Sequence, residues 1–418
     1  MTVLFLNFLS YLIWFIYVYR RDRQITVYTF MVFLYVIIAL MGVMVVETGL
    51  YYDLMSSYNF ENAPVLPYIL CFVCNIMLLE PLRYIQDIDD NDYGIFYNKR
   101  INSLVLIWSL AYVFFTVLKV NETIQTMSVG LAESYQMRHS EGVALFQYSG
   151  PLRLIYTLLT AAQPITVPFI MFYSFIGLRD KYITSSKAYF LIVLCFLPAL
   201  LSALAKGSRG SLFMEVFCFI FFVLTFWNHV NTNIKSSVKR IMICVVGFGL
   251  AYSWLISLDR AENTEVSAMD GIIRYFGEPF PNLVALYWDK INFHPMGTLM
   301  FGDFLPDVLP AYWDPSERTK FWSDLIGAPT YNWKTFFGSL YLEFGSVIAC
   351  AFTFGLSYIF KSVFKKLSVN LITLPLVYFY FQMCVFSFAG FTKNDETSLH
   401  QIIGVLLLMW ILPKFLKG

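Results

Sequence analysis

Charged residues are scarce in this chain, and their scarcity excludes an ordinary soluble domain. Only 14% of the 418 residues are Asp, Glu, Lys or Arg, whereas about a quarter are charged in a typical soluble protein. Hydrophobic residues make up 58%, and the mean hydropathy is +0.63. Apolar runs of roughly 20 residues recur along the sequence, and a helix of that length crosses the ~30 Å hydrocarbon core of a bilayer. We therefore predict an all-α polytopic integral membrane protein.

The motifs of several enzyme classes are also missing. The sequence contains no Walker loop, no HExxH, no GxSxG and no zinc-ligand spacing. The acidic run 87–92 does not fit a calcium loop, because Asp92 and Asn98 stand where that loop needs Gly and Glu. We therefore expect neither a metal nor a cofactor.

The seven cysteines all lie inside apolar runs, so the sequence suggests no disulfide framework. Cys71 and Cys74 have CxxC spacing, but within a predicted membrane helix, where we interpret them as small apolar fillers. The first apolar run, 3–19, has no basic residue before it and no small-residue cleavage site after it. We expect a retained helix there instead of a cleaved signal peptide.

Basic residues are unevenly distributed among the connectors, and this predicts the topology. Short clusters of Lys and Arg occur in alternate connectors, which the positive-inside rule places in the cytoplasm. We predict eleven spans in one transmembrane domain, 1–418, with the N-terminus outside and the C-terminus inside. The outer connectors are then 121–150, 206–210, 259–335 and 392–397. The predicted spans are 2–19, 27–47, 66–82, 102–120, 151–177, 188–205, 211–229, 241–258, 336–360, 371–391 and 398–413.

The long outer loop, 259–335, is the main polar segment of the chain. Its prolines predict a rigid, folded loop with short helices. Trp288 and Tyr275 are among its aromatic residues, and such rings stack on the C–H faces of sugars. An interfacial belt of aromatic residues on the bilayer is the alternative. Arg260 and Arg274 lie near the start of the loop, and Glu278 and His294 are candidate proton acceptors.

Two further outer segments carry candidate anion-binding residues. The turn Lys206-Gly207-Ser208-Arg209-Gly210 leads into an apolar helix, so free N–H groups and the Arg209 guanidinium would favour a diphosphate. The alternative is a plain hairpin turn with Ser208 as helix cap. Arg138 with His139, in 121–150, is a candidate anion contact or a solvated loop tip.

Three features together resemble the O-antigen polymerase family, the Wzy-type oligosaccharide repeat-unit polymerases. They are the turn at 206–210, the long outer loop, and the stretch Tyr331-Asn332-Trp333-Lys334-Thr335 followed by Leu340-Tyr341-Leu342-Glu343-Phe344-Gly345. The last stretch is similar to the family's "N-x-x-T…Y-x-[DE]-F-G" segment. The spacing from Arg260 to Gly271 also fits an Arg-x10-Gly motif of the family.

The resemblance implies a GT-C-like glycosyltransferase in the bacterial cytoplasmic (inner) membrane. It would polymerise oligosaccharides linked to undecaprenyl diphosphate, with membrane lipid around it, a chain-length regulator and a flippase as partners, and no nucleic acid. Catalytic roles would fall on Arg209, Arg260 and Arg274, which stabilise the leaving diphosphate, and on Glu278 or His294 as base. Substrate-binding roles would fall on Lys206, Ser208, Arg138, Trp288 and Tyr275. Asn332, Thr335 and Glu343 are expected to hold the loop to the following helix.

Two alternative functions remain open from the sequence. One is an O-antigen ligase, which performs the same chemistry with a lipid A acceptor. The other, from a different class, is a flippase for lipid-linked oligosaccharides. A flippase should have short outer loops and cations facing a central cavity, so the long loop favours the polymerase.

Overall fold

The computed structural model describes most of the chain. The described residues are 3–51, 55–85, 99–127, 148–206, 209–229, 232–261, 267–300, 315–330, 332–367, 369–370, 373–390 and 396–417. All the secondary-structure elements within these ranges are helices.

Eight of the described helices are long and apolar enough to cross a membrane. The helical, multi-pass class predicted from the sequence is thereby confirmed. Three further predicted spans coincide with shorter apolar helices at Phe213–Phe226, Leu374–Phe388 and Gln401–Ile411, so the count of eleven stays a prediction. The eight long helices are Val3–Asp22, Val27–Glu47, Leu66–Tyr84, Lys99–Thr126, Gly150–Arg179, Ser185–Ala205, Lys235–Leu258 and Thr335–Phe364.

The chain forms two compact units. The first comprises Met1–Ile85, Met269–Lys366 and Met383–Leu399, and the second comprises Gln86–Ala268, Leu367–Gln382 and His400–Gly418.

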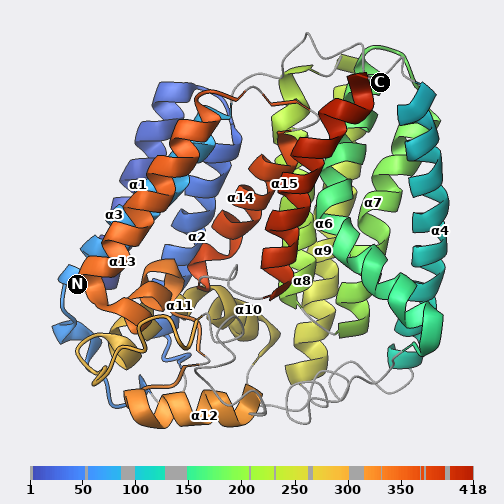
Figure 1. The fold of residues 1–418 in the computed structure, drawn as a ribbon. Helices are drawn as coiled ribbons and strands as arrows, with labels where there is room; N and C mark the ends of the chain where they lie inside the picture. The colour runs from blue at the N-terminus through green and yellow to red at the C-terminus, as the bar shows by residue number, and fades with distance from the viewer. Residues whose placement is uncertain are drawn as a thin grey trace. The chain divides into compact units, whose positions relative to one another are not determined.

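Four long helices run side by side in the first unit (Figure 1). The first packs on the second, and the third packs on the last. The second helix begins after Thr26, whose hydroxyl caps it by accepting the N–H of Thr29 at 3.1 Å. The four are α1 (Val3–Asp22), α2 (Val27–Glu47), α3 (Leu66–Leu79) and α13 (Thr335–Phe364); 3-10 helices add Phe60–Asn62, Glu80–Tyr84 and Phe386–Phe388.

The core of this bundle contains paired polar groups among aromatic rings. Tyr11 stacks on Tyr35 with ring centroids 5.6 Å apart, and Asn75 Nδ2 donates to the Tyr11 hydroxyl at 2.7 Å. The Tyr35 hydroxyl bonds to that of Ser387. Side-chain hydrogen bonds of this kind hold helices together where surrounding lipid is as apolar as the core.

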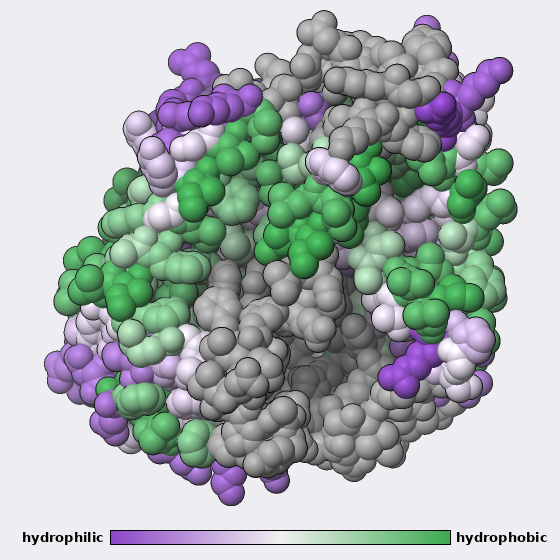
Figure 2. Space-filling view, in the orientation of Figure 1, coloured by the Kyte–Doolittle hydropathy of each residue, from purple (hydrophilic) through white to green (hydrophobic). Residues whose placement is uncertain are grey.

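The outer surface of α13 suits a lipid environment. Val347, Tyr358 and Ile359 are 80%, 73% and 58% exposed. Figure 2 shows hydrophobic residues over the part of the surface where this helix lies. Exposed aliphatic side chains of this size are expected on a face that lies against hydrocarbon chains.

Where it is described, the segment that precedes α13 forms short helices, as its prolines predicted. It contains α10 (Ala268–Gly277), α11 (Pro279–Asn282), a π-helical turn (Leu283–Tyr287) and α12 (Pro315–Ile326). Pro279 begins α11, where the missing N–H has no intrahelical role. In Figure 1, α12 lies crosswise at the end of the unit that carries α10 and α11.

A close contact of glycines joins α10 to α2. A Cβ added to Gly277 would meet the Met41 carbonyl oxygen and would lie 2.6 Å from Val45 Cγ2. A Cβ on Gly42 would lie 3.2 Å from the Gly277 carbonyl oxygen. The backbones of α10 and α2 can approach each other closely here because neither glycine has a side chain.

We expect Gly277→Ala to lower the melting temperature of the purified protein. The new methyl group meets backbone, which cannot turn away, and overpacking of this kind costs about 1–3 kcal/mol. Gly247→Ala is the matched control, because a Cβ there meets nothing within 4 Å. Equal melting temperatures for the two variants would show that α10 does not pack on α2 as described.

The second unit is built around α7, which packs on α4, α6 and α8, while α8 packs on α9. In its interior Phe221 stacks on Phe381 at 4.5 Å, and Phe222 stacks on Tyr378 at 5.0 Å. The helices are α4 (Lys99–Met127), α6 (Gly150–Arg179), α7 (Ser185–Lys206), α8 (Arg209–Phe226), a 3-10 turn (Trp227–His229), α9 (Thr232–Ala261), and parts of α14 (Leu374–Val385) and α15 (Glu396–Lys417).

Candidate functional site

The site is organised by a break in the membrane helix α13. Gly345 has φ 77° and ψ 173°, which is non-helical, so the helix consists of two parts that meet there. This backbone region is open almost exclusively to glycine. Carbonyl groups at a helix end have no intrahelical partner and need one from elsewhere.

The segment 294–300 supplies those partners. His294 Nδ1 lies 3.0 Å from the Leu342 carbonyl oxygen, and the Met296 N–H donates to the Glu343 carbonyl at 2.9 Å. The Glu343 carboxylate accepts the N–H of Gly297 at 2.8 Å and also that of Met300. Glu343 is 1% exposed, so these bonds are buried. The expectation that Glu343 holds the loop to this helix is confirmed.

His294 is oriented by its contacts on two sides. A carbonyl oxygen only accepts, so Nδ1 carries the hydrogen, and Nε2 of the neutral ring is then the accepting nitrogen. The ring meets Tyr341 edge-on with centroids 5.7 Å apart. Nε2 points toward the break, because a Cβ added to Gly345 would lie 3.4 Å from it.

Arg274, on α10, forms an ion pair with Glu278, which follows the end of that helix. Arg274 Nε donates to Glu278 Oε1 at 2.6 Å, and their side chains are 19% and 10% exposed. Burial raises the pKa of Glu278 to about 7, although the hydrogen bond from Arg274 and its charge oppose the shift. The carboxylate therefore fixes the guanidinium through one nitrogen.

Tyr275 belongs to an aromatic cluster beside this pair. Its ring meets Trp333 edge-on at 4.2 Å, and Trp333 contacts Phe388 at 6.0 Å. The Trp333 carbonyl accepts a hydrogen bond from Asn282 Nδ2 at 2.7 Å. A separate stack joins Trp288 to Tyr341 at 4.8 Å, on the same Tyr341 that His294 touches. Both aromatic residues predicted to bind sugar are thus half-buried members of clusters, with part of each side chain accessible.

Lys334 is a site residue that the sequence reading did not single out. Its ammonium donates to the carbonyls of Thr330 at 2.6 Å and Asn332 at 3.1 Å, and lies 4.9 Å from the Tyr287 ring centre. Burial lowers the pKa of Lys334 to about 7. A lysine before an apolar run usually extends toward water, so no signal in the sequence distinguished this buried one. Thr335, which follows, has φ 68°, a strained value for a β-branched residue.

The raised pKa of Glu278 and the lowered pKa of Lys334 together predict a minimum of stability near pH 7. Between pH 4.5 and 7 the folded chain holds a proton on Glu278 that the unfolded chain releases, so stability falls as pH rises. Between pH 7 and 10.5 the unfolded chain holds a proton that folded Lys334 releases, so stability rises. Melting temperatures from pH 5 to 10 should show this. Lys334→Met should remove the alkaline rise, whereas Lys320→Met, at an exposed position of α12, should not.

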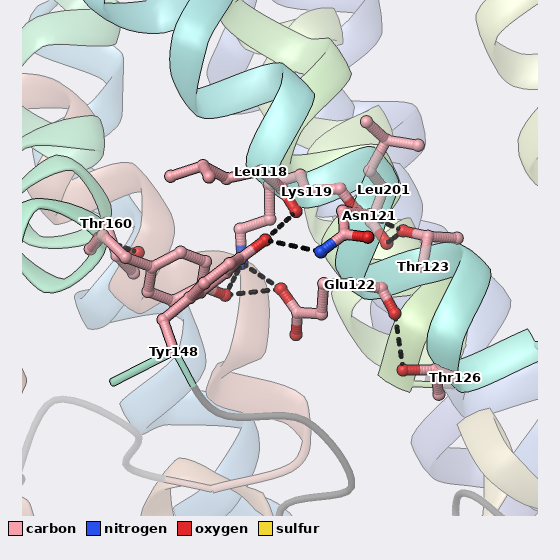
Figure 3. Close-up of polar contacts among 10 residues, drawn as sticks. Leu118, Lys119, Asn121, Glu122, Thr123, Thr126, Tyr148, Thr160 and Leu201 are labelled. Atoms are coloured by element: carbon pink, nitrogen blue, oxygen red, sulfur yellow. Dashed lines mark hydrogen bonds and ion pairs between the residues drawn. The ribbon is translucent and has the colours of Figure 1, made fainter. Parts of the chain in front are cut away.

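A second polar cluster lies in the second unit and was also missed (Figure 3). Lys119 and Glu122 form a buried ion pair at 3.1 Å, with side chains 4% and 8% exposed. The Tyr156 hydroxyl accepts from Lys119 Nζ and donates to Glu122 Oε2 at 2.6 Å. Tyr148 donates to the Leu118 carbonyl at 2.6 Å. The helix extends beyond the predicted span 102–120, because α4 continues to Met127 and holds both charges.

For three of the other predicted site residues the structure describes only the position in a helix, and two lie outside the described residues. Arg209 begins α8, Arg260 lies in the last turn of α9 and Lys206 ends α7, all in the second unit; their side chains lie outside the described parts. Ser208 and Arg138 lie outside the described residues. A convergence of the three arginines therefore stays a prediction from the sequence.

The fold defines a multi-pass helical membrane protein, and comparison with known proteins adds no family. No protein-family model matches the chain, and neither the curated proteins nor the solved structures contain a match.

Proposed function

We propose that the protein polymerises lipid-linked oligosaccharide repeat units into O-antigen or a related surface polysaccharide. The donor is a glycan on undecaprenyl diphosphate, and the acceptor is the non-reducing sugar of a new lipid-linked repeat unit. The reaction takes place at the outer face of a bacterial inner membrane, in a GT-C-like architecture with the N-terminus in the periplasm. A chain-length regulator and a flippase are the expected partners.

The observation that carries the proposal is the folded segment before α13 and its attachment to the break at Gly345. One compact unit thereby combines a membrane bundle with three kinds of group. They are a fixed guanidinium (Arg274), an imidazole with an accepting nitrogen (His294) and partly accessible aromatic rings (Trp288, Tyr275). A lipid diphosphate, a sugar hydroxyl and a sugar ring need these groups respectively.

The proposed reaction is a single glycosyl transfer. The acceptor hydroxyl oxygen bonds to the anomeric carbon of the donor, and the bond from that carbon to the diphosphate oxygen breaks. The lipid diphosphate leaves with the electron pair, and the hydroxyl proton passes to the base, Glu278 or His294. Arg274 stabilises the charge that builds on the leaving group, a role that the sequence also predicts for Arg209 and Arg260.

Purified protein in nanodiscs tests the proposal directly. Incubation with undecaprenyl-diphosphate-linked repeat units should give a ladder of longer lipid-linked glycans and release undecaprenyl diphosphate. In cells, loss of a polymerase leaves single repeat units on the surface lipid, whereas loss of an O-antigen ligase leaves none. Absence of the ladder with every repeat unit native to the host would contradict the proposal.

A flippase for the same lipid-linked oligosaccharides is a second candidate, favoured by the buried Lys119–Glu122 pair. Ionisable groups inside membrane helices often mark transport pathways, and this pair bonds with Tyr156 of α6. A flippase would move fluorescent lipid-linked oligosaccharide across proteoliposomes without lengthening it. Its loss in cells would trap the repeat unit on the cytoplasmic side.

A further inference from the structure

We infer that His294, and not Glu278, is the base of the site, and that Glu343 is the residue that positions it. The assignment of a base rests on the proposed glycosyl transfer. The arrangement of His294 at the broken helix is independent of that reaction. The nitrogen assigned to proton acceptance is Nε2.

The ion pair argues against Glu278. Its Oε1 accepts from Arg274 Nε at 2.6 Å, and its side chain is only 10% exposed. A proton transferred to this carboxylate would weaken its hold on the guanidinium while negative charge builds on the leaving group. The transfer would thus oppose the stabilisation that Arg274 provides. Glu278 is better suited to orienting Arg274.

The hydrogen bonds of His294 argue for it. Nδ1–H donates to the Leu342 carbonyl, which fixes the tautomer and leaves Nε2 with its lone pair. The described residues place no hydrogen-bond partner on Nε2. His294 is half-buried, so part of its side chain is accessible, and Gly345, the residue that faces Nε2, has no side chain. An acceptor hydroxyl needs a nitrogen in this state within hydrogen-bond reach.

Glu343 positions the imidazole through the backbone of the next residues. Its carboxylate accepts two N–H groups, those of Gly297 and Met300, and its own carbonyl accepts a third from Met296. All three donors follow His294 within six residues. Met296 has φ 56° and Gly297 has φ 99°, so this segment takes a tight course that the carboxylate holds in place.

The titratable groups around Glu343 are few among the described residues. Lys334 acts on it through charge, and Asp289 lies near Tyr341, the ring that His294 touches. Neither forms a described ion pair with Glu343. Replacing Glu343 with Gln therefore removes the charge and one N–H acceptor while the side-chain volume stays nearly the same. The neutral amide would place its NH2 group against an N–H donor.

The first test measures the tautomer of the His294 imidazole and does not depend on activity. With ¹⁵N-histidine and the variant His139→Gln/His229→Gln/His400→Gln, only His294 remains, and its nitrogen shifts above its titration show the tautomer. We expect the Nδ1–H form, and Glu343→Gln should give a mixture of tautomers. An Nε2–H form in the otherwise unaltered protein would overturn the inference, and so would a Glu343→Gln spectrum identical to the parent.

Kinetics then separate the inference from the proposed function. Glu343→Gln should lower kcat about 100-fold with little change in KM, because it misplaces a reacting group by a small distance. His294→Gln should lower kcat by about 10²–10⁴. Glu80→Gln, which replaces an ion-paired carboxylate of the same unit, is the control and should change neither kcat nor KM.

If the tautomer behaves as expected but neither the parent nor any variant extends a glycan, the proposed function fails and the positioning of His294 stands. If activity survives His294→Gln, the assignment of the base fails while the proposed function stands.

Discussion

Gly345→Ala should remove most of the activity and lower the stability of the protein. At φ 77° and ψ 173° an alanine is strained by about 1–3 kcal/mol. Two outcomes relieve the strain: the helix straightens, or its second part turns. Either one withdraws the Leu342 and Glu343 carbonyls from His294 and Met296. We expect a fall in kcat of about 100-fold or more, because His294 is then no longer held.

Gly355→Ala is the matched control for this prediction. Gly355 lies in the same helix after the break, and a Cβ there meets nothing within 4 Å. In a regular helix alanine is favoured over glycine by roughly 1 kcal/mol, so stability should be equal or slightly higher. Melting temperature and glycan-ladder assays on both variants check the pair. Wild-type activity in Gly345→Ala would mean that the break does not serve the site.

The membrane-spanning helices were the part of the fold that the sequence revealed most clearly. A long apolar run has one stable backbone in lipid, because every N–H and C=O must be paired within the segment. The predicted span 27–47 therefore matches α2 (Val27–Glu47) at both ends. Charge at a helix end was harder to interpret. The predicted span 102–120 ends before α4 does, and Lys119 and Glu122 are buried as a pair near its C-terminal end.

The candidate site was predictable only where a side chain's own chemistry determines its role. Arg274, Glu278 and His294 were selected by residue type, and the structure gives each a defined partner. The ion pair of Arg274 and Glu278 is local, but the pairing of His294 with Leu342 joins residues 48 apart, which local pattern does not encode. Gly345 was visible as part of a motif, but only the φ value shows that it breaks the helix. Lys334 could not be separated from an ordinary flanking lysine.

Arg274→Ala should have an effect on activity comparable to that of Gly345→Ala. Loss of one fixed donor to a developing oxyanion typically costs about 10²–10³ in kcat. Arg274→Lys should also be impaired, because a guanidinium presents several N–H donors in a fixed plane to a diphosphate, whereas an ammonium is a single point of charge. Arg240→Ala, at an exposed position of α9, should leave activity unchanged.

A double variant distinguishes a role in binding diphosphate from a role in neutralising Glu278. Arg274→Ala alone leaves a buried carboxyl group without the partner that lowers its pKa, so the folded chain holds the Glu278 proton above pH 7 and stability should keep falling there. Adding Glu278→Gln removes this carboxyl group, and the melting temperature should recover. Activity should not recover, because the guanidinium that meets the leaving group is still missing. Recovery of both would mean that Arg274 serves only to balance Glu278, and the diphosphate contact would then have to come from another arginine.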